Sequence, residues 1–139
     1  MANAPTLNAV VETGLYVADV ARARAFYENV LNLETIFSDD RLTAYAVGPS
    51  VLLLFTQGAT EEPAVMPIGT IPGHDGKGRL HFAFAVSAED IEPWRTHLDR
   101  HGVEIEGEVK WPQGARSLYF RDPDGHLLEV VSPGLWKNY

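Results

Sequence analysis

The chain repeats one pattern of secondary structure, and this repeat is the feature that most constrains its fold. A strand at "ETGLYV", which begins at Glu12, is followed by a helix and then by three short strands. The same order returns from "HFAFAV", which begins at His81, and both strands reach a valine five residues later before a helix starts. Each half of such a repeat is one supersecondary unit that cannot bury its apolar face alone. The sequence therefore predicts two βαβββ modules.

We expect an α+β fold in which the two tandem βαβββ modules form a curved, partly open mixed sheet, as half-barrels around a cavity. Module 1 covers about residues 8–57, and module 2 covers about residues 80–133, with a tail at 134–139. Residues 58–79 are rich in Gly and Pro and have no clear period, which is typical of a functional lid or a linker. At 139 residues, the two modules are expected to share one domain.

Composition excludes several classes of protein. With 19 acidic and 11 basic residues, the net charge is −8, which argues against a nucleic-acid partner. The absence of cysteine excludes disulfides, thiolate metal sites and a cysteine nucleophile. No apolar run approaches the roughly 18 residues of a membrane span, and the N-terminus lacks the pattern of a secretion signal. We therefore expect a cytoplasmic protein with no membrane partner.

One carboxylate lies in a segment that should be buried. Glu129 is flanked by aliphatic residues in "LLEVV", which predicts a short buried strand. Burying an ionised carboxylate is costly unless another group pairs with it. Strand alternation places His81 on the same face as Ala83, and Glu12 on the same face as Gly14. These small neighbours leave room for a metal ion or a ligand.

Three residues far apart in the chain form a candidate ligand set. Glu12 and His81 occupy the same position in the two repeats, so packing about a pseudo-twofold axis would bring them together, with Glu129 completing the set. Two carboxylates and one imidazole suit a divalent ion such as Fe, Mn, Zn, Ni or Co. Three protein ligands leave open positions for water and substrate. The alternatives are a paired structural carboxylate at Glu129, a hydrogen-bonded core imidazole at His81 and, if its strand is shifted by one residue, a solvated Glu12.

The chain resembles the vicinal oxygen chelate superfamily, which includes glyoxalase I, fosfomycin-resistance enzymes, bleomycin-resistance proteins and extradiol dioxygenases. The resemblance runs from about Val10 to Pro133 and is carried by "LYVADVARARAFYENVLNLE", "GRLHFAFAVSAEDI" and "SLYFRDPDGHLLEVVSP". It implies one divalent metal ion held by Glu12, His81 and Glu129. It also implies a homodimer, in which the two halves of a site can come from different chains.

The chain departs from particular members of this superfamily. Glyoxalase I-like members carry a fourth ligand in a segment resembling "LLELT", where this chain has "LLLFT" with Leu54 in that place. That difference favours the three-ligand members, the dioxygenases and thiol transferases. Extradiol dioxygenases resemble the chain at Tyr119, where they place a substrate-contacting tyrosine, although they hold iron with two His and one Glu. Fosfomycin-modifying members carry an arginine shortly after the last Glu, where this chain offers only Lys137.

The resemblance implies a metal-dependent enzyme that acts on a small oxygen-chelating substrate. Within that class we rank first a dioxygenase-like reaction on a catechol-type aromatic, with Tyr119 as the catalytic contact to the substrate; simple packing of Tyr119 is the alternative. A lyase, an isomerase or a thiol transferase is the alternative reaction. The rival from another class is a non-catalytic small-molecule (drug) binding protein of the bleomycin-resistance type.

The remaining histidines are expected to have lesser roles. His74 could approach a substrate if residues 58–79 act as a lid. His126 follows the turn sequence "DPDG" and is expected to be solvated. His97 and His101 are four residues apart on a predicted helix, which permits metal binding, but we favour an exposed helix surface.

Overall fold

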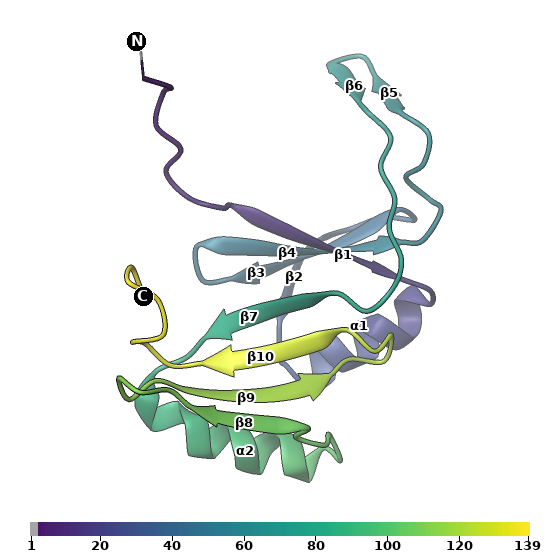
Figure 1. Ribbon diagram of the computed structural model, residues 1–139. Helices are drawn as coiled ribbons and strands as arrows, with labels where there is room; N and C mark the ends of the chain where they lie inside the picture. The colour runs from purple at the N-terminus through teal and green to yellow at the C-terminus, as the bar shows by residue number, and fades with distance from the viewer. Residues whose placement is uncertain (1–2) are drawn as a thin grey trace. The chain divides into compact units, whose positions relative to one another are not determined.

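The computed structural model describes residues 3–139, and its order of elements confirms the doubled βαβββ pattern (Figure 1). A two-stranded hairpin and a short 3₁₀ helix, η1, are added to that pattern. The elements are β1 (Glu12–Val17), α1 (Val20–Asn29), β2 (Glu34–Ser38), β3 (Leu42–Val47), β4 (Ser50–Thr56), β5 (Ala64–Met66), β6 (Gly69–Ile71), β7 (His81–Ala85), η1 (Ala88–Asp90), α2 (Ile91–Arg100), β8 (Gly107–Lys110), β9 (Arg116–Arg121) and β10 (Leu127–Val131).

The chain divides into two compact units, and α1 belongs to the second of them. The first unit contains the residues up to Val20 and Leu33–Gly76, and the second contains Ala21–Asn32 and Lys77–Tyr139. A buried hydrogen bond explains the place of α1, because the Tyr27 hydroxyl on this helix donates to Asp122 Oδ2 at 2.7 Å. The first helix of the repeat is thus held by the loop that precedes β10.

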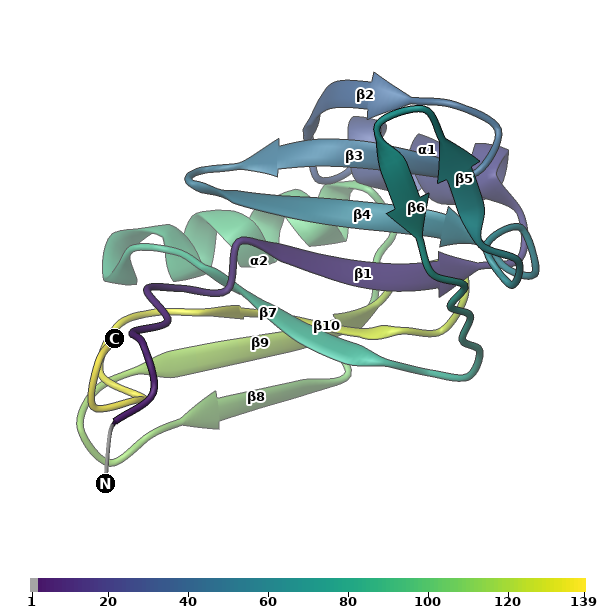
Figure 2. The same ribbon diagram turned by 90° about the horizontal axis from the view of Figure 1, so that it is seen from above.

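The first unit is built on a four-stranded sheet in the order β1-β4-β3-β2 (Figure 2). β1 runs parallel to β4, and the other pairs are antiparallel. Strand alternation separates two faces. One face is buried and includes Leu15, Val17 and Leu54, each at most 1% exposed. The other face begins with Glu12 and Gly14 on β1.

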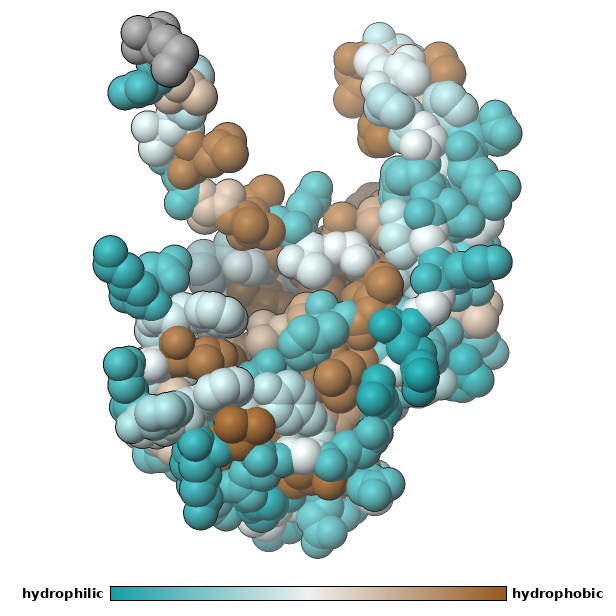
Figure 3. Space-filling view, in the orientation of Figure 1, coloured by the Kyte–Doolittle hydropathy of each residue, from teal (hydrophilic) through white to brown (hydrophobic). Residues whose placement is uncertain are grey.

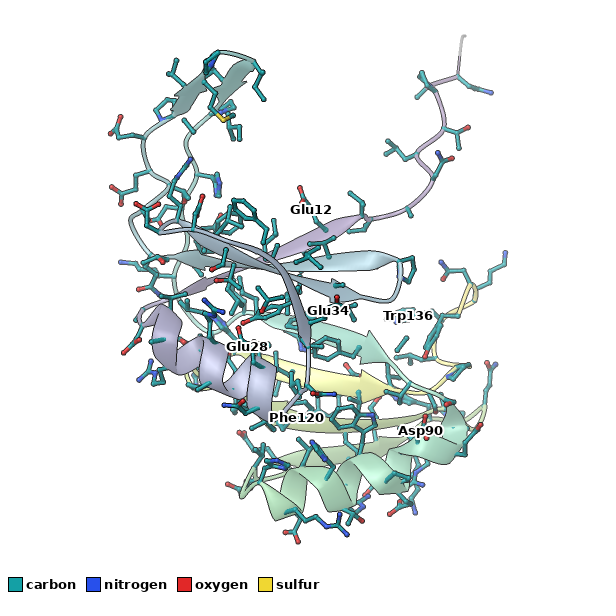
Figure 4. All side chains as sticks on the ribbon, turned by 180° about the vertical axis from the view of Figure 1, so that it is seen from behind. Glu12, Glu28, Glu34, Asp90, Phe120 and Trp136 are labelled. Carbon is teal, nitrogen blue, oxygen red and sulfur yellow. The ribbon has the colours of Figure 1, made fainter. Side chains whose placement is uncertain are left out.

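The second unit repeats this topology in the order β7-β10-β9-β8, with β7 parallel to β10 (Figure 1). Leu118 and Phe120 on β9 are fully buried on the side of the sheet that α2 covers, where Leu98 of the helix is also fully buried. Figure 4 labels Phe120 on β9 near α2. The opposite face of this sheet carries the polar residues of the candidate site.

Residues 58–79 contain regular structure that their sequence did not predict, since β5 and β6 form an antiparallel hairpin. Strands of three residues are too short for an alternating pattern to be recognised. Thr60 and His74 close the base of the hairpin, with Thr60 Oγ1 donating to the His74 carbonyl oxygen at 2.6 Å and the His74 N–H donating to the Thr60 carbonyl oxygen at 2.8 Å. The hairpin carries exposed Val65 and Ile68. Figure 3 shows hydrophobic surface at the tip of this hairpin.

Four charged side chains join α2 to the edge of the second sheet. Arg116 Nη2 on β9 donates to Glu92 on α2 at 2.6 Å and to Glu108 on β8 at 2.7 Å. Arg95 on α2 donates to Glu108 at 2.6 Å and to Glu92 at 3.1 Å. These hydrogen bonds, from Arg116 first and Arg95 next, lower the pKa of both carboxyl groups below the ordinary 4.5.

We therefore expect acid to weaken this network. Because the folded-state pKa values of Glu92 and Glu108 are lowered, their contribution to stability is present above the unfolded value and is lost as the pH falls through the folded values. Solvent screening makes the effect modest. Thermal unfolding from about pH 5 to about pH 3 should show a larger fall in Tm for the wild type than for a Glu92→Gln/Glu108→Gln double variant. Parallel falls in the two proteins would contradict this.

Candidate metal centre

Glu129 lies at the centre of a row of residues that crosses the second sheet. It pairs with Tyr119 on the antiparallel neighbour β9 and with Ala83 on the parallel neighbour β7. His81 lies two residues before Ala83, so alternation directs His81, Glu129 and Tyr119 to the same face. The register therefore brings together two of the three predicted metal ligands and the predicted substrate contact.

The imidazole of His81 is oriented by the backbone of β10. Its Nδ1 lies 2.8 Å from the carbonyl oxygen of Leu127, and its Nε2 lies 3.4 Å from Glu129 Oε1. A carbonyl oxygen only accepts hydrogen bonds, so Nδ1 carries the hydrogen and donates it. In the neutral ring, Nε2 then presents a lone pair near the carboxylate. A divalent cation bound by these two residues would relieve the repulsion between them. Metal-binding histidines are commonly oriented by a hydrogen bond of this type to a backbone carbonyl.

Glu129 is 4% exposed and is held by a neighbouring hydroxyl. Its Oε2 accepts a hydrogen bond from Ser117 Oγ at 2.5 Å, which leaves Oε1 on the side of His81. Burial, and after it the negative charge of Glu129, raises the pKa of Tyr119. The Tyr119 hydroxyl is therefore protonated at neutral pH and can donate a hydrogen bond beside the carboxylate.

Glu12 belongs to the first unit, where it is exposed at the start of β1 (Figure 4). Glu12 pairs with Val51 of the parallel strand β4, as His81 pairs with Leu127 of β10. This register confirms that Glu12 and His81 are equivalent in the two repeats. Within residues 3–139, no cluster of three or more His, Asp or Glu side chains is arranged to hold a metal ion. Glu12 stays a predicted third ligand.

The position that we assigned to Leu54 belongs instead to Leu53, the residue before it. Leu53 pairs with Gly14 as Glu129 pairs with Ala83, so Leu53 is the equivalent of Glu129 in the first unit. Leu54 is fully buried on the opposite face. A one-residue difference in register moves a side chain to the other face of a sheet. Since both residues are leucines, the first unit still offers no carboxylate at the equivalent position.

The expectation that His126 is solvated was wrong, because its side chain is fully buried. The ring Nδ1 of His126 accepts a hydrogen bond from the Leu80 N–H at 2.8 Å. The backbone N–H of His126 donates to Asp122 Oδ1 at 2.9 Å. The imidazole therefore links the start of β10 to the residue before β7. The turn sequence indicated where the chain reverses but carried no signal for this long-range contact.

The other histidines also have defined contacts. His97 Nε2 donates to the carbonyl oxygen of Val30 at 2.6 Å, so it joins α2 to the end of α1 rather than forming the exposed surface that we expected. His101 is exposed, as expected. His74 Nδ1 lies 2.7 Å from the Tyr16 hydroxyl, and its ring contacts Phe55 with a centroid distance of 4.6 Å. Alternation on β1 places Tyr16 on the same face as Glu12.

Comparison with known proteins identifies the family. The model of the Glyoxalase/Bleomycin resistance protein/Dioxygenase superfamily matches residues 7–130. The chain belongs to this superfamily, so the predicted resemblance is confirmed. The crystal structure of lactoylglutathione lyase from Agrobacterium tumefaciens has a TM-score of 0.87 and 32% sequence identity, over 96% of this chain and 99% of that one. The expected α+β fold of two tandem βαβββ modules is therefore also confirmed, and it consists of two open four-stranded sheets.

Curated relatives are similar over much of the chain. The metallothiol transferase FosB of Staphylococcus saprophyticus is 28% identical over 116 residues, which is 82% of this chain and 70% of the relative. The glutathione transferase FosA of Serratia marcescens is 50% identical over a shorter stretch of 50 residues, 36% of this chain and 34% of the relative. In the described part of the chain, no helix is both long and apolar enough to cross a membrane.

Proposed function

We propose that the protein is a divalent-metal-dependent enzyme that joins a low-molecular-mass thiol to a small oxygen-bearing electrophile, or releases the thiol from such an adduct. The observation that carries the proposal is the pair His81 Nε2 and Glu129 Oε1, 3.4 Å apart on one face of the sheet, with His81 Nδ1 anchored on Leu127. Nitrogen and oxygen donors of this type suit a divalent transition ion. Glu12 is the proposed third ligand.

The printed names of the relatives support a reaction that involves a thiol. They are a metallothiol transferase, a glutathione transferase and a lactoylglutathione lyase. The thiol transferase and lyase alternatives agree with these names, whereas the dioxygenase that we ranked first has no counterpart among them. Residues 130–139 contain Lys137 but no arginine. The electrophile is therefore proposed only as a small molecule that carries oxygen atoms.

The residues of the chain would hold the metal ion and a substrate oxygen. His81 and Glu129 would bind the ion, which, when bound, supplies Lewis-acid polarisation of a substrate oxygen. The Tyr119 hydroxyl faces the same side of the sheet as Glu129, and a phenol keeps its proton at neutral pH. Tyr119 can therefore donate a hydrogen bond to a substrate oxygen that becomes more negative during reaction. Ser117, on the other oxygen of Glu129, keeps that carboxylate oriented.

Metal content tests the proposal most directly. Wild-type protein purified without added metal should contain one divalent ion per chain by mass spectrometry, and Glu129→Gln should lose most of it. Glutamine preserves the shape of the side chain but removes the charge that attracts the cation. Thiol consumption with a panel of epoxides and α-ketoaldehydes then identifies the electrophile. Negligible metal in both proteins, with no binding of added Mn²⁺, Zn²⁺ or Ni²⁺, would remove the proposal.

Tyr119 supports a second candidate, because a protonated hydroxyl opposite a buried carboxylate is also suitable for contact with a catechol-type aromatic. Oxygen uptake by Fe²⁺-loaded protein in the presence of catechols would favour a dioxygenase. Stabilisation by aromatic compounds without any effect of a chelator would instead favour a sequestering protein. The homodimer and the cytoplasmic location stay predictions.

A further inference from the structure

A chain of hydrogen bonds extends from Glu129 away from the candidate metal centre. Glu129 Oε2 accepts from Ser117 Oγ at 2.5 Å, and Ser117 Oγ lies 2.8 Å from Trp111 Nε1. Ser117 is fully buried, and strand alternation places it on the same face as Tyr119 and Glu129. The three side chains therefore form a continuous network beside the carboxylate.

The direction of each bond in this network follows from the chemistry of the indole. The N–H of Trp111 is a donor only, so Ser117 Oγ must accept from it. The single hydrogen of the serine hydroxyl is then directed to Glu129 Oε2, because the carboxylate offers the neighbouring acceptor. Oε2 thus accepts a hydrogen bond from the protein, whereas Oε1 is the oxygen that faces His81 Nε2.

The position of Trp111 is determined by a tight turn between β8 and β9. The backbone N–H of Trp111 donates to the Ala115 carbonyl oxygen at 2.8 Å, and the backbone N–H of Gly114 donates to the Trp111 carbonyl oxygen at 3.0 Å. Gly114 has φ of 94°, a conformation that L side chains rarely adopt, and Pro112 favours the start of the turn. The indole is therefore presented to Ser117 by a short, well-defined loop.

We propose that Ser117, oriented by Trp111, is a positioning residue that reserves one oxygen of Glu129, so that Glu129 binds the metal ion through Oε1 alone. This inference rests on the proposed function. Hydrogen bonds from neighbouring residues orient metal ligands, and their removal typically weakens metal binding 10- to 100-fold. A carboxylate that binds the ion through one oxygen would occupy a single coordination position and would leave more positions for substrate oxygens.

Titration of the metal-free protein with Mn²⁺ by calorimetry tests this inference. Ser117→Ala should weaken binding by about 10- to 100-fold, because the carboxylate loses its fixed orientation. Trp111→Phe should weaken it by less, because the hydroxyl remains but is no longer oriented. Ser117→Thr keeps the hydroxyl and should restore affinity toward the wild-type value. Co²⁺-loaded Ser117→Ala should also show an altered visible absorption spectrum, since a released Oε2 changes the coordination geometry.

The controls separate this inference from the proposed function and from misfolding. If the wild type binds no metal ion, the proposed function fails. If the wild type binds Mn²⁺ and Ser117→Ala binds it equally well with an unchanged Co²⁺ spectrum, the positioning role is overturned. Circular dichroism checks that each variant is folded. Should Ser117→Ala not fold, Trp111→Phe decides, and an unchanged Mn²⁺ affinity in that variant overturns the inference.

Discussion

Replacing His81 with alanine is expected to weaken Mn²⁺ binding by more than about 100-fold, because a direct ligand contributes more than the groups that orient it. The same change should leave the Tm of the metal-free protein almost unaltered. The side chain of His81 is 49% exposed, and the hydrogen bond from its ring to the Leu127 carbonyl oxygen lies at the surface. Calorimetric titration and thermal unfolding measure the two quantities separately.

His101→Ala is the matched control, since it removes an exposed imidazole from the end of α2. It should leave Mn²⁺ affinity unchanged. Equal affinity in wild type and His81→Ala would show that the metal ion binds elsewhere. A large fall in the Tm of metal-free His81→Ala would instead indicate the core-histidine alternative, in which the imidazole is structural.

Replacing Asp122 with alanine should have the largest effect on stability, about 3–5 kcal/mol in the free energy of unfolding, because three hydrogen bonds to a buried carboxylate are lost at about 1–3 kcal/mol each. Asp122 is 5% exposed, and its Oδ1 accepts the N–H groups of Asp124 at 3.0 Å and His126 at 2.9 Å. Its Oδ2 accepts the Tyr27 hydroxyl at 2.7 Å. Alanine leaves all three donors without this acceptor, and unsatisfied buried groups carry the full cost of desolvation. Urea unfolding followed by circular dichroism measures the loss.

Two further variants separate the contribution of the two backbone hydrogen bonds to Asp122 from that of the Tyr27 hydroxyl. Asp122→Asn keeps an acceptor oxygen for the two backbone N–H groups and should cost less than alanine. Tyr27→Phe removes the bond to α1 alone and should cost about 1–2 kcal/mol. If Asp122→Ala were no less stable than Tyr27→Phe, the backbone bonds of the turn would contribute nothing, and the proposed role of the carboxylate in the second unit would be wrong.

The element pattern and the faces of the candidate ligand residues could be predicted because both depend on short-range regularities. Strand alternation is visible within a few residues, so the faces of β7 and β10 follow from "HFAFAV" and "LLEVV". The repeat then makes Glu12 and His81 equivalent, as the pairing register confirms. The adjacency of His81 and Glu129 depends on the parallel pairing of β7 with β10, which the structure shows.

By itself, the sequence determined the two βαβββ modules, the faces of their strands and the candidate ligand types, since these are properties of local periodicity and residue chemistry. Only the tertiary structure decided that Leu53 is the counterpart of Glu129, that α1 belongs to the second unit and that His126 is buried. It also decided that hydrogen bonds link Trp111 to Ser117 and Ser117 to the carboxylate of Glu129. The physical reason is that register and hydrogen-bond partners depend on contacts between distant segments, which leave no periodic trace in either segment.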